Sequence, residues 1–355
     1  MLSLVSILCA ITPVAVIVND SIYPLIQEQM DTLYLPDLRA DGFEPLVFTF
    51  SANADANALR GFLRALHEIQ GIEGVILIGR LPLAFCEAQT KFYPTDLYFY
   101  DLDGIWIDRD VDGFFDDYIG DSKPEIWGGR LACDNLTIFG MDEAGLLNSY
   151  FAKNHAYRIG MISALLSDEA LVYCEYFNGD DHLELKDQID DAYWRVRVIW
   201  EDDSTYADDY AQKLAEGYEL VLVSAHGTSQ THEFWYQGNP STFYSHQLPG
   251  IDPPSLFIMA VGCGNARYVD TNYIAGCYVF NPESPTLWCT GGTVGYPVWH
   301  HEQVMRSLQN FQTIGEACKE WYSVEWPSYW HTAMIVLIGD PTLRLRREIA
   351  RREVL

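Results

Sequence analysis

Short apolar runs alternate with segments of helical periodicity through the first third of the chain. Apolar runs at residues 14–18, 46–50 and 75–78 predict strands, and helical spacing of apolar residues fills 23–35 and 57–69 between them. This alternation is typical of βαβ units, in which crossover helices join parallel strands. The pattern therefore predicts an α/β fold with mostly parallel sheets.

The same alternation continues to the end of the chain, without an internal repeat or a low-complexity linker. At about 100 to 200 residues per domain, a chain of 355 residues is long for one core. We expect two adjacent subdomains, over residues 13–140 and 141–355. The other predicted elements are helices at 146–157, 206–215 and 315–322 and strands at 170–176, 286–290 and 335–338.

Residues 1–12 are mainly apolar but have no basic start, and Pro13 follows directly. A membrane-spanning helix needs about 20 apolar residues. We therefore expect a weak export signal over residues 1–12 and no stable membrane span.

Two apolar runs each deliver a reactive side chain at their carboxyl end. His226 follows the run at 219–225, and Cys263 follows the run at 256–261. If the two strands are neighbours in a parallel sheet, their carboxyl ends open into one crevice. A nearby imidazole can raise the thiolate fraction of a thiol or protonate a leaving group. The spacing indicates a Cys-His nucleophilic site, against the common alternative of an inert core cysteine and a structural histidine.

Glycines surround both residues: Gly227 follows His226, and Cys263 stands between Gly262 and Gly264. Unhindered backbone N–H groups can bind a developing oxyanion. We expect the amides of Gly227 and Cys263 to form that oxyanion hole.

Cys289 is a rival nucleophile, because it too ends an apolar segment before a pair of glycines. No His-Gly pair closely precedes it, so the order of motifs favours Cys263. The eight cysteines are widely spread, and no Cys-x-x-Cys pair indicates a zinc cluster.

The net charge of the chain disfavours some classes of binding partner. Fifty acidic side chains oppose 22 basic ones, giving a net charge of −28 that repels nucleic acids and anionic membranes. We expect no nucleic-acid partner.

Acidic residues gather in one segment of the first subdomain. Alternating carboxylates with a turn glycine resemble the first half of a calcium loop, since hard cations prefer several oxygen ligands. The twelfth position counted from Asp108 is Ile119 rather than a glutamate, so the segment is not an EF-hand. A solvated acidic loop is the alternative. The candidate ligands are Asp101, Asp103, Asp108, Asp110, Asp112 and Asp116.

An ordered set of motifs resembles the gingipain-type cysteine peptidases over residues 14 to 345. The set comprises Val14-Ala-Val-Ile-Val-Asn19, Val75-Ile-Leu-Ile-Gly79, Tyr93-Pro-Thr-Asp-Leu-Tyr98, Gly129-Arg130-Leu131, Ala225-His226-Gly227, Gly262-Cys263-Gly264 and Gly339-Asp-Pro-Thr-Leu343. The resemblance implies a caspase-like three-layer α/β/α fold, a catalytic Cys263 and His226, structural calcium, export from the cell and protein or peptide substrates.

The resemblance also implies a specificity. Asp96 matches the position of a pocket aspartate in arginine-specific gingipains, which implies cleavage after arginine or lysine; the alternative is that Asp96 joins the acidic loop. Trp299 is a candidate substrate-binding residue near the Gly291-Gly292 turn, since aromatic residues line peptide pockets; simple core packing is the alternative.

Arg80 departs from the family pattern, which commonly has an acidic residue there. A carboxylate that orients the histidine is therefore unassigned, with Glu233 or Asp96 as alternatives. We expect a cysteine endopeptidase; the alternative is a non-catalytic calcium-binding scaffold at the cell surface with the same fold.

Overall fold

The computed structural model describes most of the chain. The described residues are 11–88, 91–121, 123–162, 169–175, 181–190, 192–201, 204–295, 300–324 and 329–345. The predicted export signal at 1–12 therefore lies almost entirely outside the described residues.

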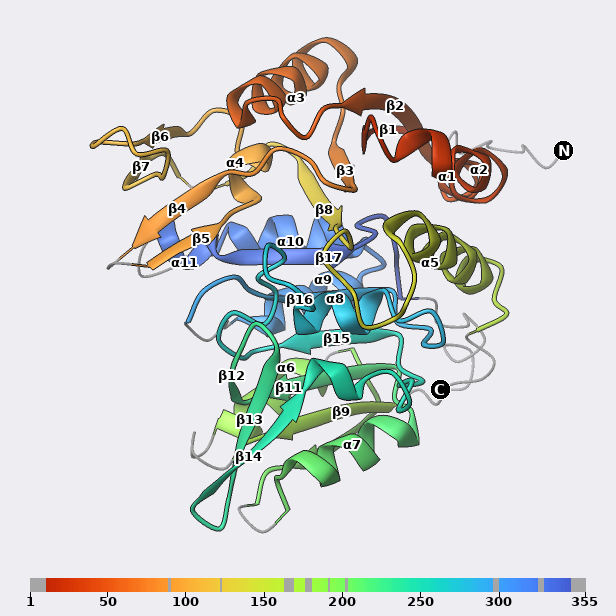
Figure 1. Ribbon diagram of the computed structural model, residues 1–355, viewed down its shortest axis with the longest axis vertical. Helices are drawn as coiled ribbons and strands as arrows, with labels where there is room; N and C mark the ends of the chain where they lie inside the picture. Colours follow the sequence, from red (N-terminus) through yellow and green to blue (C-terminus); the bar gives the residue numbers. More distant parts are fainter. Residues whose placement is uncertain are drawn as a thin grey trace, which may run out of the picture.

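A ten-stranded sheet forms the centre of the molecule (Figure 1). In order across the sheet the strands are β10 (Arg195–Ile199), β9 (Glu169–Cys174), β11 (Leu220–Ser224), β15 (Phe257–Ala260), β16 (Trp288–Gly292), β17 (Ile335–Gly339), β8 (Trp127–Leu131), β3 (Gly74–Ile78), β1 (Thr12–Asn19) and β2 (Phe43–Phe50).

Every pair of neighbouring strands is parallel except β16 and β17. The central strands β3, β11 and β17 are buried along their whole length. Sheets covered on both faces need such continuous apolar strands, which explains why the apolar runs predicted them. The prediction of a mostly parallel α/β fold is confirmed.

Helices cover both faces, so the molecule has three layers. Figure 1 shows α7 (Ala207–Glu216) and α8 (Ile274–Val279) in front of the sheet and α9 (His301–Gln309) and α10 (Ile314–Tyr322) behind it. The other helices are α1 (Tyr23–Gln29), α2 (Leu35–Ala40), α3 (Ala56–Gln70), α4 (Leu97–Tyr100), α5 (Glu143–Arg158), α6 (Asp181–Asp190) and α11 (Tyr329–Ala333).

The helix predicted over 23–35 extends further than its apolar spacing indicates. A π-helical turn at Met30–Tyr34 joins α1 directly to α2, which ends at Ala40. The helix predicted over 57–69 is α3, where the Asp55 side chain accepts a hydrogen bond from the amide of Asn57 at 2.9 Å. That capping bond satisfies a free amide of the first turn.

The connection between β11 and β15 is not a helical crossover. It contains a three-stranded antiparallel sheet of β12 (His226–Thr228), β13 (Thr231–Tyr236) and β14 (Asn239–Tyr244), followed by a 3-10 turn at Ser245–Gln247. Positive φ angles at Gln237 (50°) and Gly238 (75°) fit the tight two-residue turn between β13 and β14.

Two smaller hairpins extend from the N-terminal part of the chain. One pairs β4 (Phe85–Ala88) with β5 (Lys91–Pro94), and the other pairs β6 (Ile105–Ile107) with β7 (Asp117–Ile119). In Figure 1 the first hairpin and β12 lie on the same, left-hand side of the molecule.

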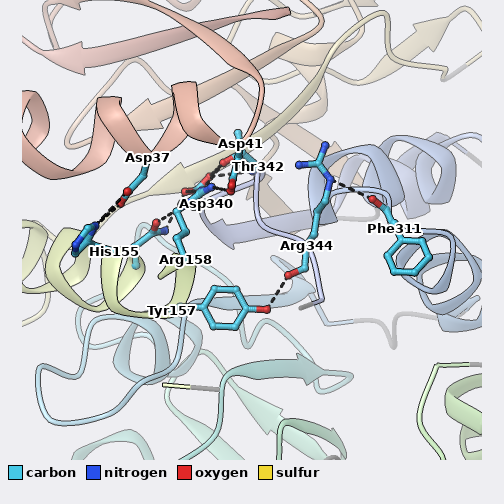
Figure 2. A network of polar contacts seen from close by, with 10 residues as sticks. Asp37, Asp41, His155, Tyr157, Arg158, Phe311, Asp340, Thr342 and Arg344 are labelled. Atoms are coloured by element: carbon cyan, nitrogen blue, oxygen red, sulfur yellow. Dashed lines mark hydrogen bonds and ion pairs between the residues drawn. The ribbon is translucent and has the colours of Figure 1, made fainter. Parts of the chain in front are cut away.

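One sheet joins the parts of the chain before and after residue 140, the predicted subdomain boundary. Strand β17, near the end of the chain, lies between β16 and β8. A buried polar network holds this closing segment in place (Figure 2). The Arg158 guanidinium donates to the Asp340 carboxylate and the Thr342 hydroxyl at 2.7 Å each and also pairs with Asp41. The Gly339–Leu343 motif thus links the C-terminal strand to α5 and α2.

Candidate active site

His226 and Cys263 emerge side by side from the sheet. Strands β11 and β15 are parallel neighbours, with Val223 paired to Ala260 and the amide of Val261 donating to the carbonyl of Val223 at 2.9 Å. His226 and Cys263 each follow the paired positions by three residues (226 − 223 and 263 − 260). The structure therefore brings the two predicted residues to the same sheet edge.

Glycine lets the two loops approach closely. A Cβ on Gly262 would lie 3.0 Å from the carbonyl oxygen of Ala225 and 2.2 Å from Oδ1 of Asn265. Gly264 adopts a left-handed φ of 67°. The loop that carries Cys263 thus depends on glycine on both sides of the thiol.

Asn265 ties the cysteine loop to the β12–β13 hairpin. Its amide nitrogen donates to the carbonyl oxygens of Thr228 at 2.7 Å and Thr231 at 3.1 Å. Because His226 begins β12, these bonds fix the hairpin of the histidine relative to the loop of the cysteine.

Cys263 is the one half-buried cysteine among those in the described part of the chain, and the others are buried. Burial raises the pKa of the Cys263 thiol; the charge of Lys91 opposes that shift, and the charge of Glu233 adds to it. Cys289 lies inside β16, fully buried, and burial raises the pKa of its thiol strongly. Accessibility therefore favours Cys263 over Cys289 as the nucleophile.

Two carboxylates approach His226. Glu175 directly follows β9, and its Oε2 accepts a hydrogen bond from the backbone N–H of His226 at 2.9 Å. Glu233 lies directly opposite His226 in the antiparallel pair of β12 and β13. Side chains at directly opposite positions project from the same face of a hairpin. Of the two alternatives from the sequence, the structure thus places Glu233 near the histidine.

Glu175 was missed by the sequence reasoning. It is 1% exposed, and its Oε1 has no hydrogen-bond partner among the described residues. Burial raises the pKa of the Glu175 carboxyl, whereas the amide and the charge of His226 oppose that shift. The sequence does show a carboxylate directly after an apolar run. Its nearness to His226 follows only from the pairing of β9 with β11, which the sequence does not show.

Gly227 lies in β12, and a Cβ there would come within 2.2 Å of the carbonyl oxygen of Thr231. Only glycine fits this close approach of two backbones. The oxyanion role of Gly227 and Cys263 stays a prediction.

Asp96 does not lie at the floor of an open pocket. It is fully buried, and its carboxylate accepts hydrogen bonds from Nε and Nη2 of Arg130, the latter at 2.6 Å. The Tyr268 hydroxyl donates to the same carboxylate at 2.9 Å. The carboxylate is thus occupied by the protein's own cation, contrary to the expected contact with a substrate arginine, and it does not join the acidic loop either.

Two further sequence expectations concern Trp299 and Arg80. Trp299 lies outside the described residues. Arg80 follows β3, which runs parallel to β17 and hence antiparallel to the strands that carry His226 and Cys263. Its position is at the opposite sheet edge, so the missing acidic residue there does not affect the histidine.

The acidic residues form two groups rather than one. Carboxylate oxygens within 4.8 Å of one another occur in the group Asp101, Asp103 and Glu125 and in the group Asp108, Asp110 and Asp116. Asp112 belongs to neither group; its side chain accepts from the amide of Phe114 at 2.9 Å. Glu125 was missed because it stands 22 positions after Asp103, and only the fold brings it near.

Among the described helices, none has the length and apolar character needed to span a bilayer.

Comparison with known proteins agrees with this geometry. The model of peptidase family C25 matches residues 14–346. Among solved structures, the Arg-specific cysteine proteinase gingipain R (RgpB) is 14% identical with a TM-score of 0.71, covering 95% of this chain and 78% of that one. The complex of Porphyromonas gingivalis RgpB pro- and mature domains matches at 14% identity and a TM-score of 0.71, covering 94% of this chain and 80% of that one. No curated protein matches the chain.

The chain belongs to peptidase family C25, with the caspase-like fold of the gingipains. It is a cysteine-type peptidase that acts on protein or peptide substrates.

Proposed function

We propose that the protein is an endopeptidase that uses Cys263 as nucleophile and His226 as general base and acid. The observation that carries the proposal is the register of β11 and β15, which puts both residues at one sheet edge. Cys263 is also the half-buried thiol, as a nucleophile that meets substrate must be.

In the proposed reaction, His226 takes the proton of the Cys263 thiol, and the sulfur electron pair attacks the scissile carbonyl carbon. The C–N bond then breaks, and the leaving amine takes the proton from the imidazolium. The resulting thioester is hydrolysed by a water molecule that His226 deprotonates, which releases the acid and restores the thiol. The backbone amides of Gly227 and Cys263 would stabilise the oxyanion in both steps.

Glu175 has the position of a residue that orients His226. Its bond to the main-chain N–H of His226 fixes the backbone, and its buried negative charge favours the imidazolium that forms during the reaction. Glu175 does not touch the reacting atoms, so its proposed role is positioning.

We also propose a preference for a basic residue before the cleaved bond, arginine first. Asp96 is not available for this contact, whereas the Glu233 charge acts on Cys263 from β13. A carboxylate close to the thiol suits a cationic side chain. Glu233→Gln should therefore lower cleavage after arginine more than cleavage after leucine in a peptide library.

Calcium is proposed as a structural ion. Three carboxylates within 4.8 Å of one another suit a hard cation that prefers oxygen ligands, and both acidic groups meet this condition. Asp108, Asp110 and Asp116 would hold one ion, and Asp101, Asp103 and Glu125 another.

Export of the protein is likewise proposed, on the apolar pattern of residues 1–12.

A peptidyl ketone with arginine next to the ketone tests the proposed nucleophile. The probe should form a covalent adduct that mass spectrometry locates on Cys263, and prior alkylation should prevent it. An adduct on another cysteine contradicts the assignment of Cys263, and no adduct at all favours a non-catalytic scaffold.

A further inference from the structure

Lys91 comes close to the Cys263 thiol from a distant part of the sequence. A Cβ placed on Gly295 would lie 2.9 Å from Nζ of Lys91 and 4.0 Å from Cβ of Cys263. The ammonium nitrogen is therefore at most about 6.9 Å, these two distances added, from Cβ of Cys263. At such a separation a unit charge still acts appreciably on a partly buried thiolate.

The backbone around Lys91 is fixed to the catalytic part of the molecule. The Phe92 carbonyl accepts a hydrogen bond from the Arg267 guanidinium at 2.8 Å, and Arg267 also donates to the Thr293 carbonyl at 3.3 Å. The Thr293 hydroxyl in turn donates to the carbonyl of Pro94 at 2.8 Å. Strand β5 is thus held from both the cysteine loop and the loop after β16.

The direction of the Lys91 side chain follows from strand alternation. Residues two apart on a strand project from the same face. Tyr93 is buried, and its hydroxyl donates to the carbonyl of Trp330 at 3.3 Å, so this face of β5 is turned toward the protein. Lys91 shares that face at the exposed start of the strand, where Phe92 on the other face is 51% exposed.

We infer that Lys91 is a positioning residue of the peptidase, whose ammonium group favours the thiolate form of Cys263. The N-terminal part of the chain thereby contributes a charge to a site whose nucleophile and base come from the C-terminal part. This inference rests on the proposed role of Cys263 as nucleophile.

The other charges that act on the thiol are few among the described residues. Glu233 on β13 opposes thiolate formation, and His226 at the start of β12 lies at the same sheet edge. Arg267 is engaged with Asp270 and two carbonyls. The electrostatic effect agrees with the geometry, because the charge of Lys91 lowers the pKa of the Cys263 thiol against the effect of burial.

The test is the pH dependence of Cys263 alkylation by iodoacetamide in the full chain, followed by mass spectrometry of the Cys263 peptide. Lys91→Gln should move the alkylation midpoint to higher pH and slow the reaction at neutral pH by about threefold to tenfold. Lys91→Arg should restore the wild-type profile. Lys123→Gln is the matched control, since Lys123 is an exposed lysine of the same subdomain, 3.8 Å from Asp121, and should change nothing.

A Lys91→Gln profile that superimposes on that of the wild type, with an unchanged melting temperature, overturns the inference. If Lys91→Gln does not fold, Lys91→Met decides in the same way: the Cys263 midpoint should move to higher pH, and an unmoved midpoint overturns the inference. The proposed function fails separately, if the peptidyl ketone does not modify Cys263 whatever the alkylation profile.

Discussion

The backbone N–H of His226 donates a 2.9 Å hydrogen bond to the carboxylate of Glu175, which directly follows β9, the strand beside β11. The candidate base is therefore held by a buried acid at the same sheet edge as the thiol. Two strands supply the reacting side chains, and a third supplies the group that holds one of them.

Glu175→Gln should lower kcat by about tenfold, with little change in KM. Glutamine retains an oxygen that accepts the backbone bond but loses the charge that favours the imidazolium, and a bond to a charged group contributes about 1.5 to 3 kcal/mol. Steady-state kinetics with a fluorogenic arginine peptide would measure the effect. Glu169→Gln, at the other end of β9, is the control and should retain full activity. Unchanged kcat in Glu175→Gln would remove this residue from the account.

Asp96→Asn should destabilise the protein rather than change its specificity. The substitution leaves the buried Arg130 without its anionic partner, and breaking such a pair costs about 3 to 5 kcal/mol. Denaturant unfolding would measure the loss, with the surface variant Asp31→Asn as control. A stable Asp96→Asn protein that no longer prefers arginine would place Asp96 in the substrate pocket after all.

Calcium removal should lower the melting temperature, because an ion that binds only the folded state stabilises it by mass action. Asp110→Asn should weaken calcium binding, since Asp110 belongs to one of the carboxylate groups. Asp112→Asn should not, because Asp112 lies outside both groups. Equal calcium uptake by Asp110→Asn and wild type, or a melting temperature indifferent to chelator, contradicts the proposed site.

Glu143 should make stability depend on pH. Burial raises the pKa of its carboxyl to about 7, with the charge of Asp134 adding to the shift and Arg80 opposing it. The pKa is higher in the folded than in the unfolded chain, so the stabilisation is complete below about pH 4.3 and is lost as pH rises through the folded pKa.

Glu143→Gln should consequently raise the melting temperature by about 1 to 3 °C at about pH 8.5 and leave it unchanged at about pH 4. Thermal unfolding at the two pH values measures this difference. A gain of the same size at both pH values would show that ionisation of Glu143 is not the cause.

The parts of the fold that could be predicted from the sequence are those set by the local pattern of apolar and polar residues. Buried parallel strands such as β3 and β11 are continuous apolar runs, so their positions and the residues at their ends could be predicted. The β12–β14 sheet was not, because short polar strands such as His226–Thr228 carry little hydrophobic alternation.

Contacts between residues far apart in the sequence could not be predicted from local pattern. Asp96 and Arg130 stand 34 positions apart, and nothing in the pattern shows that they form a buried pair. The positions of Lys91 and Glu175 near the candidate site follow only from the β4–β5 hairpin and from the order of strands across the sheet. The Cys-His pair could be predicted from the sequence because each residue closely follows an apolar run, and the two runs form neighbouring strands.

The central claim is that Cys263 is the nucleophile, and the most direct measurement is peptide hydrolysis by Cys263→Ala beside Cys289→Ala. The first variant should lose activity by about a thousandfold or more while it keeps the melting temperature of the wild type, because it removes one small half-buried side chain. Cys289→Ala should remain active. Near-normal hydrolysis by a folded Cys263→Ala protein, or loss of activity in a folded Cys289→Ala protein alone, would contradict the account.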